Sequence, residues 1–339
     1  MVVVNYHDDL NEVQGDPVLA ALLSAPYAAA PFDRIEWFEA LASECGMQPL
    51  YAFAREGDAA VMLPLRRDAD GLTALANWYS FRFKPVFLGR VDYRIDQHVM
   101  LLAAIARDLA RQCKRVTLAG VPDEWGETEA LERAFHLTGW TVFRSVSDVN
   151  HVLPVNGRSY ADFLATRPGP LRTAVKRKAG KVDVSLHCNF DPQVFAEYSD
   201  IYAASWKPDE GSPAFLRRFA EEEGKAGRLR MAIARVDGRP VAAQLWTVEH
   251  GTAYIHKLAH REDARALSPG TVLSAALFEQ VIDRDRVALV DFGTGDDAYK
   301  RDWMEQVRPR YRLDMLRAGS PRNWPRIARH VLRRLAGRG

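Results

Sequence analysis

The chain has 339 residues, 47% of them hydrophobic and 27% charged, and its formal net charge is +2. This length can bury one large or two ordinary cores, and the nearly balanced charge gives no reason to expect a nucleic-acid partner. Cys45, Cys113 and Cys188 lie far apart without a CxxC pair, which argues against a zinc site and a disulfide framework and favours a reducing cytoplasm.

The chain starts with MVVVNYHDDLNEVQGD, a short apolar run followed by acidic residues where a signal peptide carries positive charge. We expect no signal sequence. No later run approaches the roughly 20 apolar residues that a membrane-spanning helix requires. These features predict a cytoplasmic protein that is soluble or peripheral to a membrane.

Strands and helices alternate along the first 150 residues. Two apolar runs within 50–65, separated by polar residues and a glycine, predict a hairpin. Residues 96–112 have the spacing of an amphipathic helix, and 116–119 form the expected strand after it. A second helix at 127–138 then leads into a strand at 140–146. This alternation indicates a layered α/β half.

At residues 150–159 the sequence predicts the end of a strand, then a turn and the capped start of a helix. We place a domain boundary there. The expected organisation is an N-terminal half over residues 1–150, a second half over 151–320 and a basic tail over 321–339.

Residues 167–181 carry a run of cations without an acidic residue. The cations are Arg167, Arg172, Lys176, Arg177, Lys178 and Lys181. A solvated helix face explains such a run, and so does a surface that meets the phosphates of a substrate or anionic lipid head groups. Both interpretations stay open, because unbalanced cations repel one another unless a negative partner is near.

Short strands dominate the second half. Apolar runs predict strands at 182–187, 229–236 and 240–248, and a further run at 253–258 precedes a helix. Tight turns such as Asp237-Gly238 join neighbouring strands, which is typical of antiparallel pairing. The expected fold class is α/β (α+β), with a mixed and largely antiparallel sheet flanked by helices.

The tetrapeptide Ser268-Pro269-Gly270-Thr271 predicts the start of that helix. Ser268 suits the N-cap, and Pro269 suits the first helical position because its missing N–H is no loss there. Free N–H groups of Gly270 and Thr271, with the positive end of the helix dipole, would bind an anion such as a pyrophosphate. Ordinary helix capping is the alternative, and it is the commoner use of these residues.

A strand expected at 287–290 follows this helix and runs into Asp291-Phe292-Gly293-Thr294-Gly295-Asp296-Asp297. The order is strand, helix, strand. Carboxylates at the end of a strand lie where open sheets present ligand sites, and glycines let a backbone approach a ligand closely.

The tail at 321–339 contains six arginines and no acidic residue. Ile327, Val331 and Leu335 recur at i, i+4 and i+8, so a helix here could lie on a membrane surface with its arginines at the head groups. A frayed or packed terminal helix is the alternative.

Several of these residues carry a resemblance to a known family. The run from His256-Lys257 through Ser268-Pro269-Gly270-Thr271 to Asp291-Phe292-Gly293-x-Gly295-Asp296-Asp297-x-Tyr299-Lys300-x-x-Trp303, with Trp206-Lys207-Pro208 upstream, resembles the CelD-like and Fem-like branch of the GNAT acyltransferase superfamily. The resemblance implies two tandem GNAT-like domains with the acyl-CoA site in the second. Gly270 alone matches the ordinary pyrophosphate loop, Gln/Arg-x-x-Gly-x-Gly/Ala, which leaves longer acyl donors and the aminoacyl-tRNA of Fem enzymes open.

Acyl transfer to an amine needs a proton acceptor, a donor to the carbonyl oxygen and a leaving thiolate. His256 is the candidate base, and Asp291 and Asp296 are candidates to hold the acceptor ammonium or to act as a base through water. Tyr299 would donate to the leaving sulfur, and Lys300 would polarise the carbonyl or balance phosphates. A structural histidine and a local ion-pair network are the alternative interpretations of these residues.

The remaining expected site residues fall into two groups. The cofactor-binding group is Ser268, Pro269, Gly270 and Thr271, and the substrate-binding group is Trp206, Lys207, Lys257 and Trp303. No metal is expected.

We expect an acyl-CoA-dependent N-acyltransferase acting on an amine of a cell-envelope precursor: an amino sugar, a polysaccharide precursor or a sphingoid base, as in bacterial ceramide synthesis. The acceptor is small or lipid-linked, and the tail could contact the inner membrane face. The alternatives are a Fem-like aminoacyl-tRNA-dependent transferase and a non-catalytic protein that binds nucleotides or anionic lipid.

Overall fold

The computed structural model describes residues 1–13, 16–22, 30–88 and 96–337. The chain divides into two compact units, Met1–Val149 with Pro309–Gly339, and Asn150–Arg308. The sequence led us to end the second half at residue 320, whereas the chain re-enters the first unit at Pro309. Arg338 and Gly339 of the expected tail lie outside the described residues. No helix in these ranges is long and apolar enough to cross a membrane.

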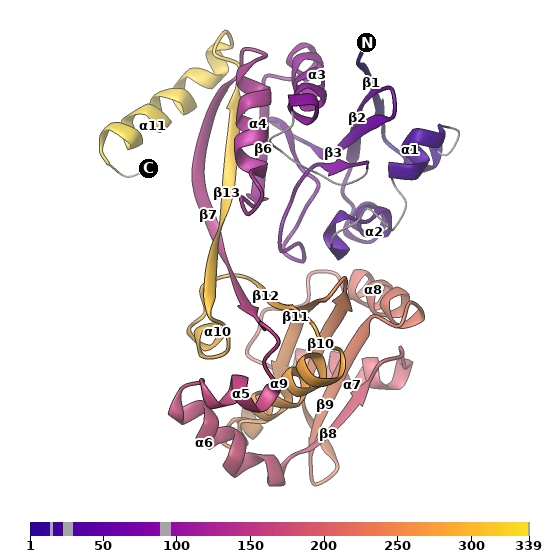
Figure 1. Cartoon of the computed structure of the whole chain (residues 1–339), viewed down its shortest axis with the longest axis vertical. Coiled ribbons are helices and arrows are strands. Elements are labelled where there is room, and N and C mark those ends of the chain that lie inside the picture. Colours follow the sequence, from indigo (N-terminus) through magenta and orange to yellow (C-terminus); the bar gives the residue numbers. More distant parts are fainter. Residues whose placement is uncertain (14–15, 23–29, 89–95, 338–339) are drawn as a thin grey trace. The chain divides into compact units, whose positions relative to one another are not determined.

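The first unit is built on a mixed sheet (Figure 1). Its strands are β1 (Val3–His7), β2 (Pro49–Glu56), β3 (Ala59–Asp68), β4 (Gly71–Ala74), β5 (Val86–Phe87), β6 (Arg115–Val121) and the first-unit parts of β7 (Thr141–Pro154) and β13 (Gln306–Leu316). The strand order is β1-β2-β3-β4-β6-β13, with β5 paired to β3. All of these pairs are antiparallel except β4 with β6. The predicted hairpin is confirmed, because Glu56 pairs with Ala59 across its turn.

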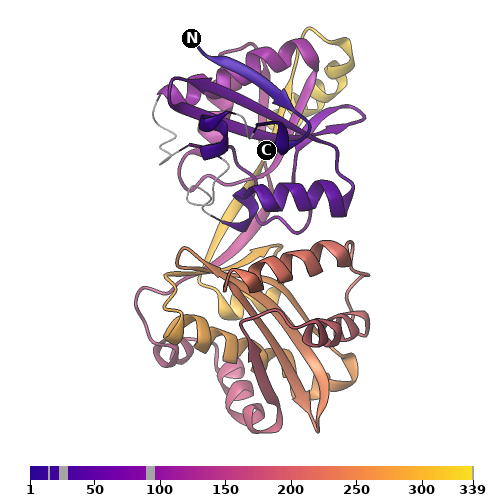
Figure 2. The ribbon, with the colours of Figure 1, turned by 90° about the vertical axis from the view of Figure 1, so that its right-hand side faces the viewer.

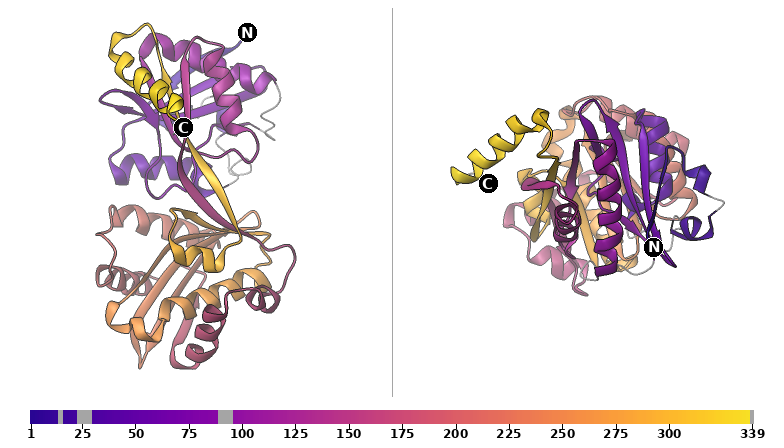
Figure 3. Two further views of the ribbon diagram at one scale, coloured as in Figure 1. Left: turned by 90° about the vertical axis from the view of Figure 1, so that its left-hand side faces the viewer. Right: turned by 90° about the horizontal axis from the view of Figure 1, so that it is seen from above.

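Helices surround this sheet. They are α1 (Pro17–Leu22), α2 (Ile35–Cys45), α3 (Asp96–Gln112), α4 (Glu127–His136) and α11 (Trp324–Leu335). Those before α11 in the chain bury apolar side chains in the core of the first unit. On α3, Leu101, Ile105 and Leu109 are fully buried, as the predicted amphipathic spacing requires. Helix α11, yellow in Figure 3, runs on the outside of this unit.

The second unit contains a sheet of order β7-β12-β11-β10-β9-β8. Its other strands are β8 (Asp183–His187), β9 (Leu229–Val236), β10 (Arg239–Glu249), β11 (Thr252–His260) and β12 (Leu289–Thr294). Pairing is antiparallel throughout except between β11 and β12, which are joined through a helix and pair in parallel. The expected mixed and largely antiparallel sheet is confirmed.

Helices cover both faces of the second sheet (Figure 2). They are α5 (Tyr160–Ala165), α6 (Gly169–Lys178), α7 (Pro192–Ala203), α8 (Pro213–Lys225), α9 (Pro269–Glu279) and α10 (Ala298–Trp303). Helix α9 packs on β9, β10 and β11 and lies beside α6, while α7 packs on β10 and β11 with α8 next to β9. Leu273, Leu277 and Phe278 of α9 are fully buried in this core, which confirms the predicted apolar face of the helix.

Candidate functional site

A cavity of about 580 Å³ lies between α9 and the ends of β11 and β12. The two strands pair only from Thr252–Leu289 to Tyr254–Asp291. Beyond that point the pairing stops although both strands continue, and their side chains line the cavity. The parallel strands therefore separate at the C-terminal end where the helix connecting them starts, and this separation creates the space. Its volume is in the range of small-molecule and cofactor sites.

The start of α9 forms one wall of this cavity, and Ser268, Pro269, Gly270 and Thr271 all line it. Pro269 occupies the first helical position as predicted. Ser268, however, is in the left-handed conformation at φ 49° and its side chain makes no capping hydrogen bond. Its carbonyl instead accepts the N–H groups of Thr271 (3.0 Å) and Val272 (3.2 Å).

Fewer free N–H groups are present at this helix start than the sequence led us to expect. The Thr271 N–H donates to the Ser268 carbonyl, so of the two expected donors in the described residues only the Gly270 N–H is free. The helix dipole adds to that donor and favours negative charge at the mouth. The cavity wall thus retains an anion-binding character that rests on one amide rather than two.

Gln244 of β10 holds the first turn of α9 in place. This side chain is buried, and its Nε2 donates to the Gly270 carbonyl (3.1 Å) and to the Ser274 hydroxyl (2.7 Å). Its Oε1 accepts the indole N–H of Trp246 at 2.8 Å. These hydrogen bonds hold the start of α9 against the sheet, and Ser274 lines the cavity. Gln244 was not among the site residues expected from the sequence, although a glutamine inside an otherwise apolar strand indicates a buried polar contact.

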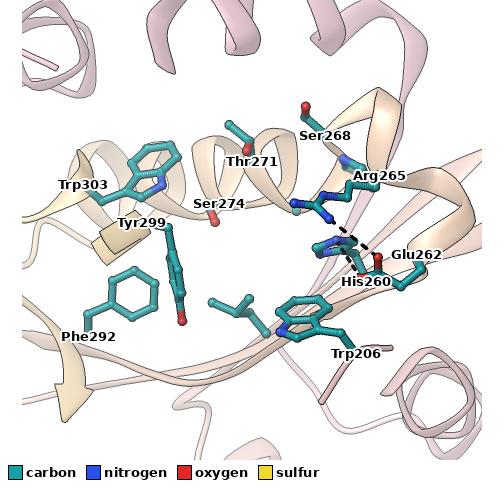
Figure 4. Close-up of a pocket in the computed structure, with 13 residues that line it drawn as sticks. Trp206, His260, Glu262, Arg265, Ser268, Thr271, Ser274, Phe292, Tyr299 and Trp303 are labelled. Carbon is teal, nitrogen blue, oxygen red and sulfur yellow. Dashed lines mark ion pairs between the residues drawn. The ribbon is translucent and has the colours of Figure 1, made fainter. Parts of the chain in front are cut away.

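His260 and Trp206 close another side of the cavity (Figure 4). Their ring centroids are 4.3 Å apart. Glu262 lies 3.9 Å from the imidazole Nε2 and 3.9 Å from Arg265. Burial lowers the pKa of His260 below its ordinary value, since the nearby carboxylate only partly offsets the lost solvation. The imidazole is neutral near neutral pH and can accept a proton.

His256, the histidine singled out from the sequence, faces the other side of the sheet. Ile255 and Lys257 pair with consecutive residues of β10, so His256 is the extra residue of a β-bulge. Its ring packs edge-on against Phe219 of α8 at 4.8 Å, and its Nε2 lies 2.8 Å from the hydroxyl of Thr247. A bulge reverses the alternation of side chains, which is why His260 reaches the cavity and His256 does not.

Helix α10 contributes Tyr299 and Trp303 to the cavity. The Tyr299 ring meets Phe292 edge-on at 5.6 Å, and burial raises the pKa of this phenol to about 12. It therefore stays protonated and is a hydrogen-bond donor at all ordinary pH values. Trp303 is buried and stacks on Phe278 of α9 at 4.6 Å, so it also ties α10 to the helix that forms the wall.

The two aspartates expected at the site do not belong to the cavity lining. Asp291 lies inside β12 rather than after it, and its buried carboxylate accepts from Asn150 Nδ2 (2.7 Å) and from the Gly293 N–H (2.8 Å). Asp296 is half-exposed and pairs with Arg301, whose hydrogen bond holds the pKa of the carboxyl below its usual range. Both contacts are those of structural carboxylates that hold β7, β12 and α10 together.

Lys300 is buried and likewise outside the cavity lining. Its ammonium donates to the carbonyl of Thr294 and to that of Gly295 (3.2 Å), with Asp297 at 3.8 Å. It lies 5.5 Å from the ring centroid of Phe292, which does line the cavity. Lys300 thus shapes the turn after β12 and supports the wall from behind.

A second cavity of about 280 Å³ is lined by α7, α8 and the connection between them. Its lining is Phe195, Tyr198, Ser199, Tyr202, Ala203, Lys207, Pro208, Asp209, Glu210, Pro213 and Leu216. Burial lowers the pKa of Lys207 to about 8, and the nearby Lys257 ammonium adds to the effect. Lys257 pairs with Glu210 at 2.8 Å and lies over the Tyr202 ring. Trp206 and Lys207 are neighbours in sequence, yet they line different cavities, so this connection borders both.

The larger cavity combines a neutral imidazole, a protonated phenol and a helix start that favours negative charge. The imidazole can accept a proton from a bound ligand, the phenol can donate one, and the helix start can hold the anionic part of that ligand. Among the described residues, no group of three or more histidine, cysteine or acidic side chains could hold a metal ion.

Comparison with known proteins gives a family-model match over part of the chain and a fold. Residues 171–301 match the family model described as an acetyltransferase (GNAT) domain. No curated protein matches the chain. The crystal structure of FemX aligns with 94% of this chain and 98% of its own, with a TM-score of 0.65 and 10% identity.

Two further solved structures align over almost their whole lengths. L-PGS from Bacillus licheniformis covers 92% of this chain and 99% of its own, with a TM-score of 0.53 and 14% identity. A tandem GNAT protein from the clavulanic acid biosynthesis pathway covers 92% and 98%, with a TM-score of 0.52 and 14% identity. At these identities the likeness establishes the fold, and the expected pair of GNAT-like domains is confirmed.

Proposed function

We propose that this chain, a GNAT-type transferase by its acetyltransferase domain at residues 171–301, moves an acyl group from a CoA thioester to the amine of a cell-envelope precursor. The observation that carries the proposal is the cavity of about 580 Å³ where β11 and β12 separate, with the start of α9, His260 and Tyr299 around it. The same cavity supports a ligand with an anionic end and an extended chain.

The anionic end of the donor belongs at the start of α9. The free N–H of Gly270 and the helix dipole attract phosphate there. Helix α6 carries Arg172, Lys176, Arg177 and Lys178 of the basic run, whereas Arg167 precedes it and pairs with Glu305. The helix packs beside α9, and Lys178 donates to the Ala266 carbonyl (2.9 Å) two residues before Ser268. These contacts bring part of the basic run close to the helix start, which favours the phosphate-binding interpretation of the run over a merely solvated face.

The chemistry assigned to the cavity needs two protein groups. The amine nitrogen attacks the thioester carbon, and His260 accepts the proton that this nitrogen loses. The carbon–sulfur bond then breaks, and the Tyr299 phenol donates a proton to the departing thiolate. The proton held by His260 then returns to the Tyr299 phenolate through solvent, which restores both groups. His260 takes the role that was expected of His256 from the sequence, while Tyr299 keeps its expected role.

The acceptor is proposed to approach from the second cavity, which shares the 206–210 connection with the first. Three aromatic rings, those of Phe195, Tyr198 and Tyr202, line it beside Lys207. Rings of this kind suit an acceptor with an apolar portion, and a lysine with a pKa of about 8 suits a nearby phosphate or a proton exchange with the acceptor amine. The wall composition thus favours a sphingoid base or lipid-linked amine over a free amino sugar.

A two-substrate assay tests this function directly. The full chain is incubated with acetyl-CoA or a long-chain acyl-CoA and with a glucosamine, a lipid-linked amino sugar or a sphingoid base, and thiol release is followed together with the mass of the product. We expect thiol release that depends on the amine. Absence of thiol release with every thioester would reject the CoA donor.

One comparison favours a second candidate. FemX aligns with this chain at a higher TM-score, 0.65, than the tandem GNAT protein does, 0.52. Enzymes of the Fem type take their acyl group from aminoacyl-tRNA, so the same assay includes a charged tRNA pool as donor. Transfer from aminoacyl-tRNA without turnover of any acyl-CoA would select this alternative.

A further inference from the structure

Helix α11 of the first unit has an apolar face that is exposed to solvent. Trp324, Val331, Leu332 and Leu335 retain 59%, 43%, 65% and 81% of their accessible surface. With Ala328 these residues recur at i, i+4, i+7, i+8 and i+11, which places them on a single stripe of the helix. An exposed stripe of this size on a strongly amphipathic helix indicates a binding surface.

A different side of the helix holds it to the first unit. The His330 ring stacks on Phe143 at 4.4 Å with an interplanar angle of 9°, and Arg326 pairs with Asp70 at 2.6 Å. These two residues lie one turn apart, away from the apolar stripe. The helix is therefore fixed in place by polar and stacking contacts, and its apolar stripe is left for another occupant.

The charge of the helix identifies the kind of occupant. Arg322, Arg329 and Arg333 are exposed and make no ion pair within the described residues. Residues 315–339 contain no acidic side chain. Arg329, three residues before Leu332, borders the stripe, while Arg322 precedes the helix and Arg333 lies on its far side. A surface that meets the stripe therefore also meets uncompensated cations at its border and at the start of the helix. The occupant must be apolar in its interior and negative at its boundary.

We propose that α11 docks the protein on a membrane that contains anionic lipid. Val331, Leu332 and Leu335 enter the boundary between head groups and acyl chains, Trp324 lies at the same level, and the arginines contact lipid phosphates. A second copy of the chain fits less well, because a two-fold pairing of this stripe brings the two sets of arginines together. This proposal is independent of the donor used by the transferase domain.

Co-sedimentation of the full chain with lipid vesicles tests the proposal. Vesicles of phosphatidylcholine alone are compared with vesicles of phosphatidylcholine and phosphatidylglycerol. We expect binding to the second kind only, weakened by added salt because the arginine contacts are screened. The double variant Leu332→Glu/Leu335→Glu should reduce the partition coefficient at least about tenfold, since two buried apolar side chains are replaced by charges.

Two further variants make the result specific. Arg329→Glu/Arg333→Glu should weaken binding to anionic vesicles while leaving the folded state intact. Leu137→Glu, a matched change at a leucine that is 57% exposed elsewhere in the first unit, should bind like the parent chain. Circular dichroism confirms that each variant is folded.

Three outcomes would overturn the proposal. The first is no binding to either kind of vesicle, and the second is binding that Leu332→Glu/Leu335→Glu leaves unchanged. The third is a dimer, seen by sedimentation in solution without lipid, that the same double variant abolishes, because the stripe would then be a contact between two copies.

Discussion

The imidazole of His260 lies against the indole of Trp206, with the ring centroids 4.3 Å apart, and both rings line the larger cavity. Burial, to which this contact contributes, lowers the pKa of the imidazole. Because Trp206 immediately precedes Lys207 of the second cavity, the same contact also fixes the connection that borders both cavities.

Replacement of His260 by glutamine should lower kcat by about 10²–10⁴-fold if this residue accepts the amine proton. Glutamine keeps a similar size and can still pack on Trp206, so KM for acyl-CoA should change little. In the parent enzyme the rate should fall at acid pH, with a midpoint below the ordinary histidine pKa, because only the neutral imidazole accepts a proton. The variant should lose this acid limb.

The control for this experiment is His256→Gln. His256 lies four residues earlier on the same strand and faces α8 instead of the cavity. Its replacement should leave the pH profile unchanged. A loss of the acid limb in His256→Gln, with normal behaviour of His260→Gln, would return the role of base to the histidine first chosen from the sequence.

Tyr299→Phe removes a hydroxyl and keeps the ring that meets Phe292. The expected effect is a decrease of kcat by about 10–100-fold with an unchanged KM for the donor, because the lost interaction forms only as the thiolate leaves. Since burial raises the pKa of Tyr299 to about 12, the parent enzyme should show no alkaline limb from this phenol in the ordinary assay range. Steady-state kinetics with a thiol reagent measure both parameters. If KM for the donor rises by the same factor while kcat stays constant, Tyr299 acts in substrate binding instead.

The sequence predicted the strand–helix–strand framework of the second unit because its apolar periodicity and turn residues are local signals. Pro269 at the first turn of α9 follows from its own backbone geometry. The role of Ser268 could not be predicted in the same way. Its left-handed conformation is imposed by the preceding 3₁₀ turn, Glu262–Leu267, and takes its side chain out of the capping position.

The side-chain directions on β11 were beyond sequence reasoning for a different reason. Regular alternation puts His256 and His260 on one face, and only the pairing with β10 reveals the bulge between them. Asp291 shows the same limit, because its partner Asn150 is distant in sequence. The return of β13 to the first unit is equally non-local.

Gln244→Leu tests whether the buried network positions the start of α9. The substitution leaves the Gly270 carbonyl, the Ser274 hydroxyl and the Trp246 indole N–H without their partner. We expect a loss of about 1–3 kcal/mol in the free energy of unfolding, since unpaired buried polar groups are destabilising. Urea denaturation measures this loss, and Ser274→Ala, which removes a single hydrogen bond, should lose less. Equal stability of Gln244→Leu and the parent chain would show that water replaces the network.

Lys207→Met should stabilise the protein near neutral pH while impairing acceptor binding. Burial lowers the pKa of Lys207 from 10.5 to about 8, so the folded state disfavours the charged form that the unfolded chain prefers. Below about pH 8 this penalty is fully present. Between pH 8 and 10.5 the unfolded state holds more protons than the folded state, so the stability of the parent chain rises with pH across this window.

The methionine variant lacks this titration. Its advantage should be about 1–2 kcal/mol near pH 7, since one pKa unit corresponds to about 1.4 kcal/mol and partial solvent access reduces the effect. The advantage should vanish at about pH 10.5. Chemical denaturation at both pH values measures it, and Lys225→Met, a change at an exposed lysine of α8, should shift stability by less than about 0.5 kcal/mol at either pH. A Lys207→Met variant that is less stable than the parent chain at neutral pH would contradict this prediction. It would show that the Lys207 ammonium has a stabilising partner in the second cavity, with which an acceptor would compete.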